Sequence, residues 1–294
     1  MSFVVLLISY ALQQKMDWPL SLQFDRVTIK FLRPEHFSMM AKSSGAAYFL
    51  LLLILLAYFS LFYVLFFLIG NTFFGALSLC LQVVVLLLVL GQKGFKDNLE
   101  SYLVAWKRGD FEAAAFKQQT LSGVNGRLLR DPVMMQNEVS KALLYHNFNR
   151  FFVITFWFMV AGPAMIIVVR VADLIAQHSS HQLRRAAVSV NAAIEWLPAR
   201  LLALTFTLTG DFRRSISGCM KYWVDVTSDT PDVLGEVASS TLDSFYLNNV
   251  IDSKIDKGIL ISTGVNGIIG IRGLLGRSMA LWLGIFAISV IFAI

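Results

Sequence analysis

Hydrophobic residues gather into long uncharged runs along this chain. Residues 46–69, 72–91 and 151–169 contain no Asp, Glu, Lys or Arg, and residues 278–294 form a fourth run of this kind. A helix needs about 20 apolar residues to cross a hydrocarbon core roughly 30 Å thick. The first three runs reach this length and the fourth lies near its lower limit, so the pattern predicts four transmembrane helices.

These runs are expected to be helical. In a bilayer only α-helices and closed barrels satisfy all of their backbone hydrogen bonds, and the runs lack the alternating pattern of barrel strands. The predicted fold class is therefore all-α: a polytopic helical membrane protein with about four transmembrane helices, accompanied by interfacial or re-entrant amphipathic helices.

Polar stretches between the runs divide the chain into regions. The predicted organisation is an N-terminal interfacial segment (1–45), a transmembrane hairpin (46–91), a polar helical region (92–150), a third transmembrane helix (151–169), a large polar and interfacial region with a P-A-R-L block (170–277) and a C-terminal transmembrane helix (278–294).

Four shorter stretches carry weaker helical signals. Residues 3–12 are too short to span and are interpreted as a retained interfacial or buried helix. Apolar residues at helical spacing predict one amphipathic helix over 95–119. Residues 186–210 lie on the membrane, re-enter it or span it; the first two are favoured, with Pro198 in a first turn. The glycine-rich stretch 258–276 is expected to be an interfacial or re-entrant element.

Composition and charge agree with a membrane protein. Hydrophobic residues make up 56% of the chain and charged residues only 15%, whereas soluble domains carry about 25% charged residues. The net charge is +6. In a soluble protein this could suggest nucleic acid, but Lys and Arg beside apolar runs set orientation and contact anionic headgroups. The expected partner is the lipid bilayer, not nucleic acid.

The chain lacks the common catalytic signatures. It contains no G-x-x-x-x-G-K-[ST], H-E-x-x-H or G-x-S-x-G pattern. His178 and His181 are interpreted as loop residues rather than metal ligands, and Asp225, Asp229 and Asp232 as the start of a helix rather than a magnesium site. We therefore expect neither a metal nor a cofactor.

Polar residues at the two ends of the third run form a first candidate site. His146, Asn147 and Arg150 precede the run, and Arg170 and Asp173 follow it. Ionisable groups near the membrane need partners and often mark ligand sites. The alternative is structural: the arginines anchor the helix at the two interfaces, with Asp173 pairing to Arg170 one turn away.

A second candidate site contains Asn191, Glu195, Arg200 and Asp211. Asn191 and Glu195 are four residues apart and share a helix face, and the long side chain of Arg200 brings its guanidinium within reach of Glu195. Such a pair next to apolar surface could hold a phosphate or carboxylate. It could equally be a structural ion pair that fixes an interfacial helix.

These residues also carry a family resemblance. Residues 194–201 (I-E-W-L-P-A-R-L), followed by Gly-Asp at 210–211, resemble the W-[IVL]-P-[AV]-R-L … G-D block of the AmpE family of inner-membrane proteins. The block is also similar to one in the cobalamin-biosynthesis membrane proteins CobD/CbiB. F-W-F at 156–158, Gly-Pro at 162–163 and Arg170 extend the resemblance to both families.

The chain departs from the cobalamin enzymes at two places. They resemble one another in an acidic-Asn pair followed by Asp before the third span, where this sequence has His146-Asn147 and Arg150. After the span they carry Lys…Asn-Thr-Leu-Asp, where this sequence has Arg170 and Asp173. Two carboxylates that could bind metal or act in acid–base catalysis are thus replaced, which favours the AmpE-like interpretation.

The resemblance implies a function. It implies a multi-pass protein of the bacterial inner membrane that acts as a sensor, transducer or accessory factor linking peptidoglycan state to β-lactamase induction. A non-enzymatic role is favoured, and catalytic activity is left open. The expected partners are an anionic cell-wall-derived small molecule and a regulatory protein. The alternative implied by the second family is a membrane synthase that forms an amide in cobalamin biosynthesis.

Overall fold

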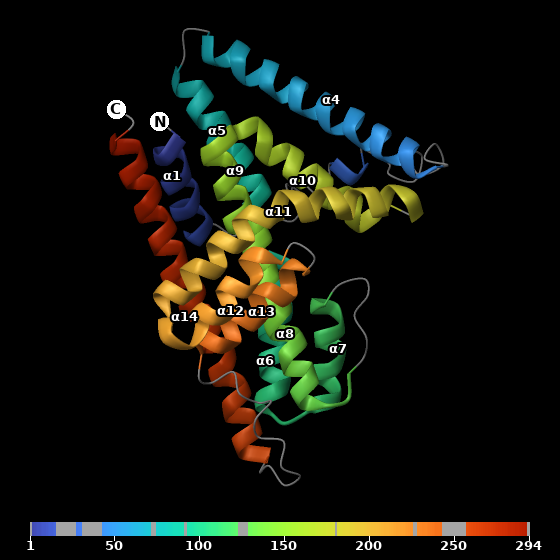
Figure 1. Cartoon of the computed structure of the whole chain (residues 1–294), viewed down its shortest axis with the longest axis vertical. Coiled ribbons are helices and arrows are strands. Elements are labelled where there is room, and N and C mark those ends of the chain that lie inside the picture. The colour runs from blue at the N-terminus through green and yellow to red at the C-terminus, as the bar shows by residue number, and fades with distance from the viewer. Residues whose placement is uncertain are drawn as a thin grey trace. The chain divides into compact units, whose positions relative to one another are not determined.

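The structure is a computed structural model that describes residues 2–15, 28–30, 43–71, 75–90, 93–122, 129–179, 181–225, 228–242 and 257–292. Its elements are all helical, and no strand occurs within these ranges (Figure 1). The predicted all-α class is therefore confirmed. The chain forms two compact units. Unit 1 comprises residues 1–91, 150–195 and 289–294, and unit 2 comprises residues 92–149 and 196–288.

Each unit has its own set of helices. Unit 1 contains α1 (Ser2–Lys15), α4 (Ser44–Asn71), α5 (Gly75–Leu90), α9 (Ile154–Ala161), α10 (Pro163–His178) and the first part of α11 (His181–Thr209). Unit 2 contains α6 (Lys93–Lys107), α7 (Phe111–Leu121), α8 (Pro132–Asn147), the rest of α11, α12 (Phe212–Val224), α13 (Thr230–Thr241) and most of α14 (Lys257–Phe292). A π-helical turn, Phe148–Val153, follows α8.

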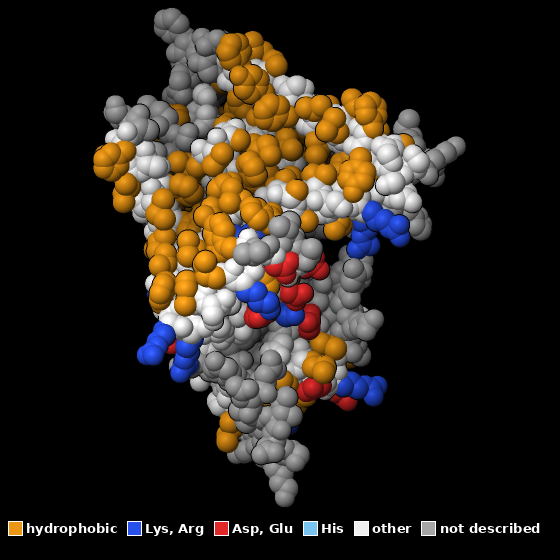
Figure 2. All heavy atoms as spheres, viewed as in Figure 1, with side chains coloured by type: hydrophobic (Ala, Val, Ile, Leu, Met, Phe, Trp, Pro, Cys, Tyr) orange, Lys and Arg blue, Asp and Glu red, His pale blue; other side chains and the backbone are white. Residues whose placement is uncertain are grey.

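Within the described ranges, three helices are long and apolar enough to cross a membrane. They are Ser44–Ile69 in α4, Gln182–Thr209 in α11 and Lys257–Ser289 in α14. The first is a helix of spanning length at the place where the sequence predicts a span, residues 46–69. Its most apolar stretch is only 6% buried, and hydrophobic side chains gather over α4 in Figure 2. Such an exposed apolar helix suits the hydrocarbon core of a membrane.

Residues 186–209 and 258–292 each belong to one continuous helix. Residues 186–209 lie in α11, whose length and composition fit a span, so the choice between a surface, re-entrant or spanning segment stays a prediction. The glycine-rich stretch and the C-terminal run form a single helix of 36 residues instead of two elements. Isolated glycines cost a helix about 1 kcal/mol each, so packing must stabilise this part of α14.

A polar network in unit 2 supplies that packing. Trp106 of α6 donates its indole N–H to the carbonyl of Ile261 at 3.3 Å. Gln136 of α8 donates to the carbonyl of Gly264 at 2.7 Å and accepts from the hydroxyl of Tyr102 at 2.9 Å. A Cβ on Gly264 would lie only 2.6 Å from the indole nitrogen of Trp106. Glycine thus allows α14 to approach α6 closely.

The third predicted span is interrupted. Residues 151–169 cover the end of the π-helical turn, all of α9 and the start of α10. Gly162 separates α9 from α10 with a φ of 81°, a conformation that favours glycine, and Pro163 occupies the first turn of α10. The Gly-Pro pair therefore ends one helix and begins another inside an uncharged run.

Two further segments refine the sequence predictions. The expected single amphipathic helix over 95–119 is two helices, α6 and α7, because Gly109 adopts a φ of 71° and the side chain of Asp110 caps α7 by accepting from the backbone N–H of Ala113. Residues 3–12 lie in α1, as predicted. Val5 and Leu6 are buried there, and Tyr10 makes an edge contact with Phe151.

Helix α10 forms the centre of unit 1. It packs against α4, α5 and α9, and every residue from Ile166 to Ala176 is buried. The predicted run at 72–91 corresponds to α5, whose 16 residues are near the lower limit for a span. Helix α1 packs against α5 and α9. Unit 1 therefore buries two charged residues of α10, Arg170 and Asp173, among helices that are almost entirely apolar.

Candidate functional site

The P-A-R-L block lies in the interior of α11. Pro198 is the eighteenth residue of this helix rather than a first-turn residue, contrary to the sequence prediction. A proline has no backbone N–H, so the carbonyl four residues earlier, that of Ile194, loses its helical donor. The indole N–H of Trp157 donates to this carbonyl at 3.3 Å. A side chain of α9 thus replaces the bond that Pro198 removes.

Arg200 follows Pro198 and is almost completely buried, at 1% exposure. Its guanidinium donates to the carbonyl of Asp225 at 2.8 Å and to that of Trp196 at 3.3 Å. The guanidinium carbon also lies 4.7 Å from the centre of the Trp196 ring, a cation–π distance. The carboxylate of Asp225 attracts the guanidinium electrostatically. Residues of unit 2 therefore hold this cation through carbonyls, a ring and a nearby carboxylate.

Two buried donors at this place have no acceptor among the described residues. They are Nε of Arg200 and Nε1 of Trp196. A buried donor without an acceptor costs about 1–3 kcal/mol, and such groups mark places where a water or a ligand completes the structure. Both donors belong to side chains that are in cation–π contact with each other.

The Gly-Asp pair after the block has a structural explanation. A Cβ on Gly210 would lie 2.8 Å from Cβ of Thr241, so glycine allows the end of α11 to approach α13. The side chain of Asp211 accepts from the backbone N–H groups of Arg213 and Arg214 at 3.1 and 3.3 Å. Asp211 is thus the N-cap of α12, and it also pairs with Arg214.

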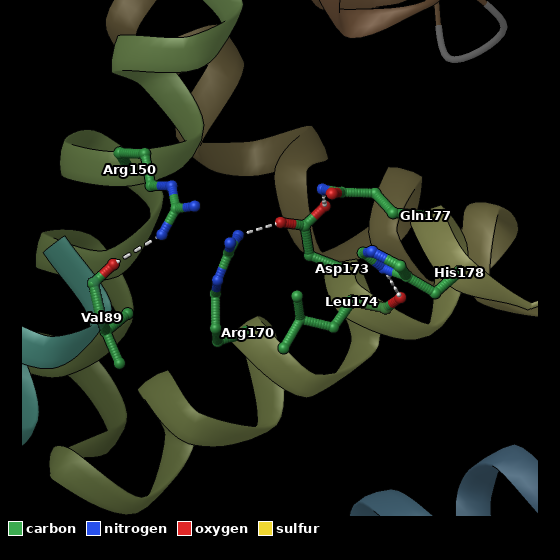
Figure 3. A network of polar contacts seen from close by, with 7 residues as sticks. All are labelled: Val89, Arg150, Arg170, Asp173, Leu174, Gln177 and His178. Carbon is green, nitrogen blue, oxygen red and sulfur yellow. Dashed lines mark hydrogen bonds and ion pairs between the residues drawn. The ribbon is translucent and has the colours of Figure 1, made fainter. Parts of the chain in front are cut away.

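Arg150 stabilises the end of a helix in unit 1 (Figure 3). It comes from the π-helical turn and donates to the carbonyl of Val89 at 3.0 Å. The last four carbonyls of a helix lack helical donors, and α5 ends one residue later at Leu90. A cation at a helix C-terminus also interacts favourably with the helix dipole. Arg150 therefore ties the π-helical turn to α5.

Arg170 and Asp173 form a buried ion pair on α10 (Figure 3). Their side chains are only 6% and 9% exposed, and Gln177 donates to the second oxygen of Asp173 at 2.8 Å. The predicted pairing of Asp173 with Arg170 one turn away is confirmed. Further along α10, Nδ1 of His178 lies 3.1 Å from the carbonyl of Leu174.

His146 and Asn147 belong to unit 2. The ring of His146 stacks on Phe95 of α6 with centroids 3.9 Å apart. The amide of Asn147 donates to the carbonyl of Leu143 at 2.8 Å, within α8. Both residues therefore stabilise the end of α8 where the chain enters the π-helical turn.

Comparison with known families decides the classification. A family model described as "Regulatory signalling modulator protein AmpE" matches residues 3–255. The chain belongs to the AmpE family. The match includes Trp157, Pro198 and Arg200, so the resemblance noted in the sequence lies within the matched region. Neither curated proteins nor solved structures give a significant match.

The AmpE-family chain distributes the predicted site residues over two units. Arg150, Arg170, Asp173, Asn191 and Glu195 belong to unit 1. Arg200, Asp211, His146 and Asn147 belong to unit 2. The structure pairs Arg170 with Asp173. Glu195 is buried and Asn191 half-buried on neighbouring turns of α11, as their spacing predicts.

Sequence reasoning missed two important residues of the AmpE-family site. Trp196 contributes a ring and an unpartnered donor, and Trp157 donates to the carbonyl that Pro198 leaves without a helical donor. Both lie in motifs quoted for the resemblance, but the chemistry of an indole N–H gives no signal in a hydrophobic pattern. Asp225 contributes through its main-chain carbonyl, which no sequence pattern identifies. Asp229 begins α13, as predicted for this acidic stretch.

Proposed function

We propose that this protein is a sensor, transducer or accessory factor of the bacterial inner membrane that links peptidoglycan state to β-lactamase induction. The family description supports a regulatory role, and three helices of spanning length support a membrane location. The ligand in this proposal is an anionic small molecule derived from the cell wall, and the signal passes to a regulatory protein partner.

The observation that carries the proposal is the environment of Arg200. The helix that contains it is long enough to cross a membrane, and an ionisable residue in such a helix marks a functional site by default. The unpartnered N–H groups of Arg200 and Trp196 point to an acceptor from outside the described residues. A carboxylate of a muramyl peptide is the kind of acceptor that such donors bind.

The chain also has a route for transmitting such an event. Two of the places where it passes between the units lie at helix irregularities: residues 149–150 are inside the π-helical turn, and residues 195–196 are close to Pro198. Helices bend at prolines and at π-bulges, because the regular hydrogen-bond ladder is interrupted there. A ligand bound by Arg200 and Trp196 acts on α11 within one turn of the Pro198 irregularity. This supports a transducing role.

Binding tests the proposal. The probe is the pool of N-acetylmuramyl peptides released from purified sacculi by a muramidase, titrated into the full-length protein in nanodiscs by calorimetry. Trp196→Phe keeps the ring beside Arg200 but removes the unpartnered donor, and we expect it to weaken binding roughly tenfold or more. Trp106→Phe is the control, because its indole donor already has a protein acceptor, the carbonyl of Ile261, outside the proposed site. Absence of saturable binding by the wild type, or equal binding by Trp196→Phe, contradicts the proposal.

A further inference from the structure

A groove beside α4 joins an apolar cavity to a cationic one within unit 1. The apolar cavity has a volume of about 340 Å³, and hydrophobic residues of α4, α10 and α11 line it. Its α4 wall extends from Tyr48 to Phe59. The cationic cavity, of about 660 Å³, lies between the start of α4 and the first turns of α11. Tyr48 lines both cavities, so they meet at its side chain.

The cationic cavity contains two adjacent arginines. Arg184 and Arg185 line it together with Gln182, Ser44 and Ser189. Arg184 is half-buried and Arg185 is exposed, and neither has an ion-pair partner among the described residues. Lys and Arg side chains are visible beside the N-terminal end of α11 (Figures 1 and 2). Two guanidinium groups with free donors present a binding surface for a phosphate.

The position of the groove along α4 matches the profile of a bilayer. The apolar part of α4, Ser44–Ile69, contains 26 residues. At 1.5 Å per residue it rises about 39 Å, which exceeds a hydrocarbon core of roughly 30 Å. Its first turn therefore lies at headgroup level, where the cationic cavity is. The apolar cavity lies deeper, and Tyr48 lies between the two, as interfacial tyrosines do.

We propose that this groove binds one lipid with a phosphate head and a long apolar chain. The phosphate contacts Arg184 and Arg185, and the chain follows α4 past Leu55 to Phe59. The groove has arginines at one end and no charged residue in the lining of the other. This combination favours an amphiphile over a soluble anion or a second helix. The site shares no residue with the pair Arg200–Trp196, so it is independent of the proposed signalling site.

Native mass spectrometry of the delipidated full-length protein tests this inference. The probes are dioleoyl phosphatidylglycerol, dioleoyl phosphatidylcholine and a long-chain polyprenyl phosphate, each titrated separately. We expect at least one of the two phosphate-headed anionic lipids to bind as a single adduct about tenfold more tightly than the zwitterionic lipid. Tighter binding of phosphatidylglycerol assigns the site to a bilayer lipid, and tighter binding of polyprenyl phosphate assigns it to a lipid carrier. Equal binding of all three contradicts recognition of the head.

Three variants locate the bound lipid. Arg184→Gln/Arg185→Gln should remove the preference for an anionic head. Arg213→Gln/Arg214→Gln is the matched control, because it removes an equal charge from the start of another helix that lines neither cavity. Leu55→Trp fills the apolar cavity and should weaken all three lipids.

The control variant should bind like the wild type. If the control weakens lipid binding as much as the Arg184/Arg185 variant does, the anionic lipids are attracted by the overall positive charge rather than by this groove, and the proposal is wrong. If Leu55→Trp leaves lipid binding unchanged but dissociates a dimer, the groove holds a second copy of the chain and the proposal is wrong as well.

Discussion

The indole N–H of Trp157 donates to the main-chain carbonyl of Ile194 at 3.3 Å. This is the carbonyl that Pro198 leaves without a helical donor, because proline lacks an N–H. A proline in a helix interior costs about 3 kcal/mol or more when nothing compensates for it. Trp157 and Pro198 therefore act as a pair, although 41 positions separate them in the sequence.

Trp157→Phe should destabilise the protein. It removes the donor but keeps an aromatic ring, so the carbonyl of Ile194 becomes unsatisfied at a cost of about 1–3 kcal/mol. The measurement is the free energy of unfolding in mixed micelles, from a titration with sodium dodecyl sulfate. Trp196→Phe is the control, because its N–H has no acceptor among the described residues; its free energy of unfolding should remain near the wild-type value.

A double-mutant cycle tests whether the indole of Trp157 compensates for the donor that Pro198 lacks. Pro198→Ala restores a backbone N–H that can donate to Ile194, so Trp157→Phe should cost much less in this background. A cost that is the same in both backgrounds means that the indole of Trp157 does not compensate for the proline.

Gly264→Ala should destabilise α14 where it packs on α6. The new Cβ would lie 2.6–2.8 Å from atoms of the Trp106 ring, which is fully buried and cannot move away. Overpacking of this kind costs about 1–3 kcal/mol. Gly273→Ala in the same helix has no atom within 4 Å of its new Cβ. Because alanine favours helix more than glycine does, thermal unfolding should show a lower Tm for Gly264→Ala and an unchanged or higher Tm for Gly273→Ala.

Hydrophobic patterning predicted the most exposed apolar helix. The run at 46–69 became α4 because its side chains face outward, where hydropathy alone decides their environment. Patterning failed where backbone geometry or packing between distant residues decides where a helix begins or ends. The φ of 81° at Gly162 divides an apolar run. The contacts of Gly264 with Trp106 and Gln136 make a glycine-rich stretch helical. Neither effect depends on hydrophobicity.

Asp173→Asn should be strongly destabilising. It removes the negative charge that Asp173 places beside the buried cation of Arg170, and breaking a buried pair costs about 3–5 kcal/mol. Arg170→Met/Asp173→Leu replaces the pair by apolar side chains and should recover most of the lost free energy of unfolding. If the double variant is no more stable than Asp173→Asn, the two charges do not act as a pair in stabilising unit 1.

Stability should decrease at alkaline pH because of two buried tyrosines in unit 2. Burial raises the pKa of Tyr102, and burial together with the hydrogen bond to Glu236 raises the pKa of Tyr222. Both phenols therefore remain protonated in the folded protein above pH 10, the ordinary pKa of tyrosine, whereas the unfolded chain loses these protons. The free energy of unfolding should fall as pH rises from 10 by up to about 1.4 kcal/mol per unit for each group.

Chemical unfolding of the wild type between pH 8 and 11.5 measures this decrease. The variant Tyr102→Phe/Tyr222→Phe should be less stable at pH 8, because it lacks two hydrogen bonds, but its stability should fall less steeply above pH 10. Equal slopes for the two proteins contradict the assignment to these tyrosines.

The candidate site was predicted only in part. Spacing identified the pair Arg170–Asp173, because both partners lie on one helix, three residues apart. The block at 194–201 drew attention to Arg200, but its partners are the ring of Trp196 and the carbonyl of Asp225. A carbonyl is present in every residue, so sequence carries no information about which one binds a cation. Long-range packing between α11 and the end of α12 selects it.

The most direct test of the regulatory function is the response of β-lactamase to an inducing β-lactam in cells. A strain with an inducible chromosomal β-lactamase carries the wild-type gene for this protein, Trp196→Phe, Arg200→Ala or a deletion, and membrane levels are measured by immunoblot. The account predicts that Trp196→Phe reduces the ratio of induced to uninduced activity toward that of the deletion at wild-type membrane levels. An unchanged ratio for both variants at normal levels, or a deletion without effect, would contradict it.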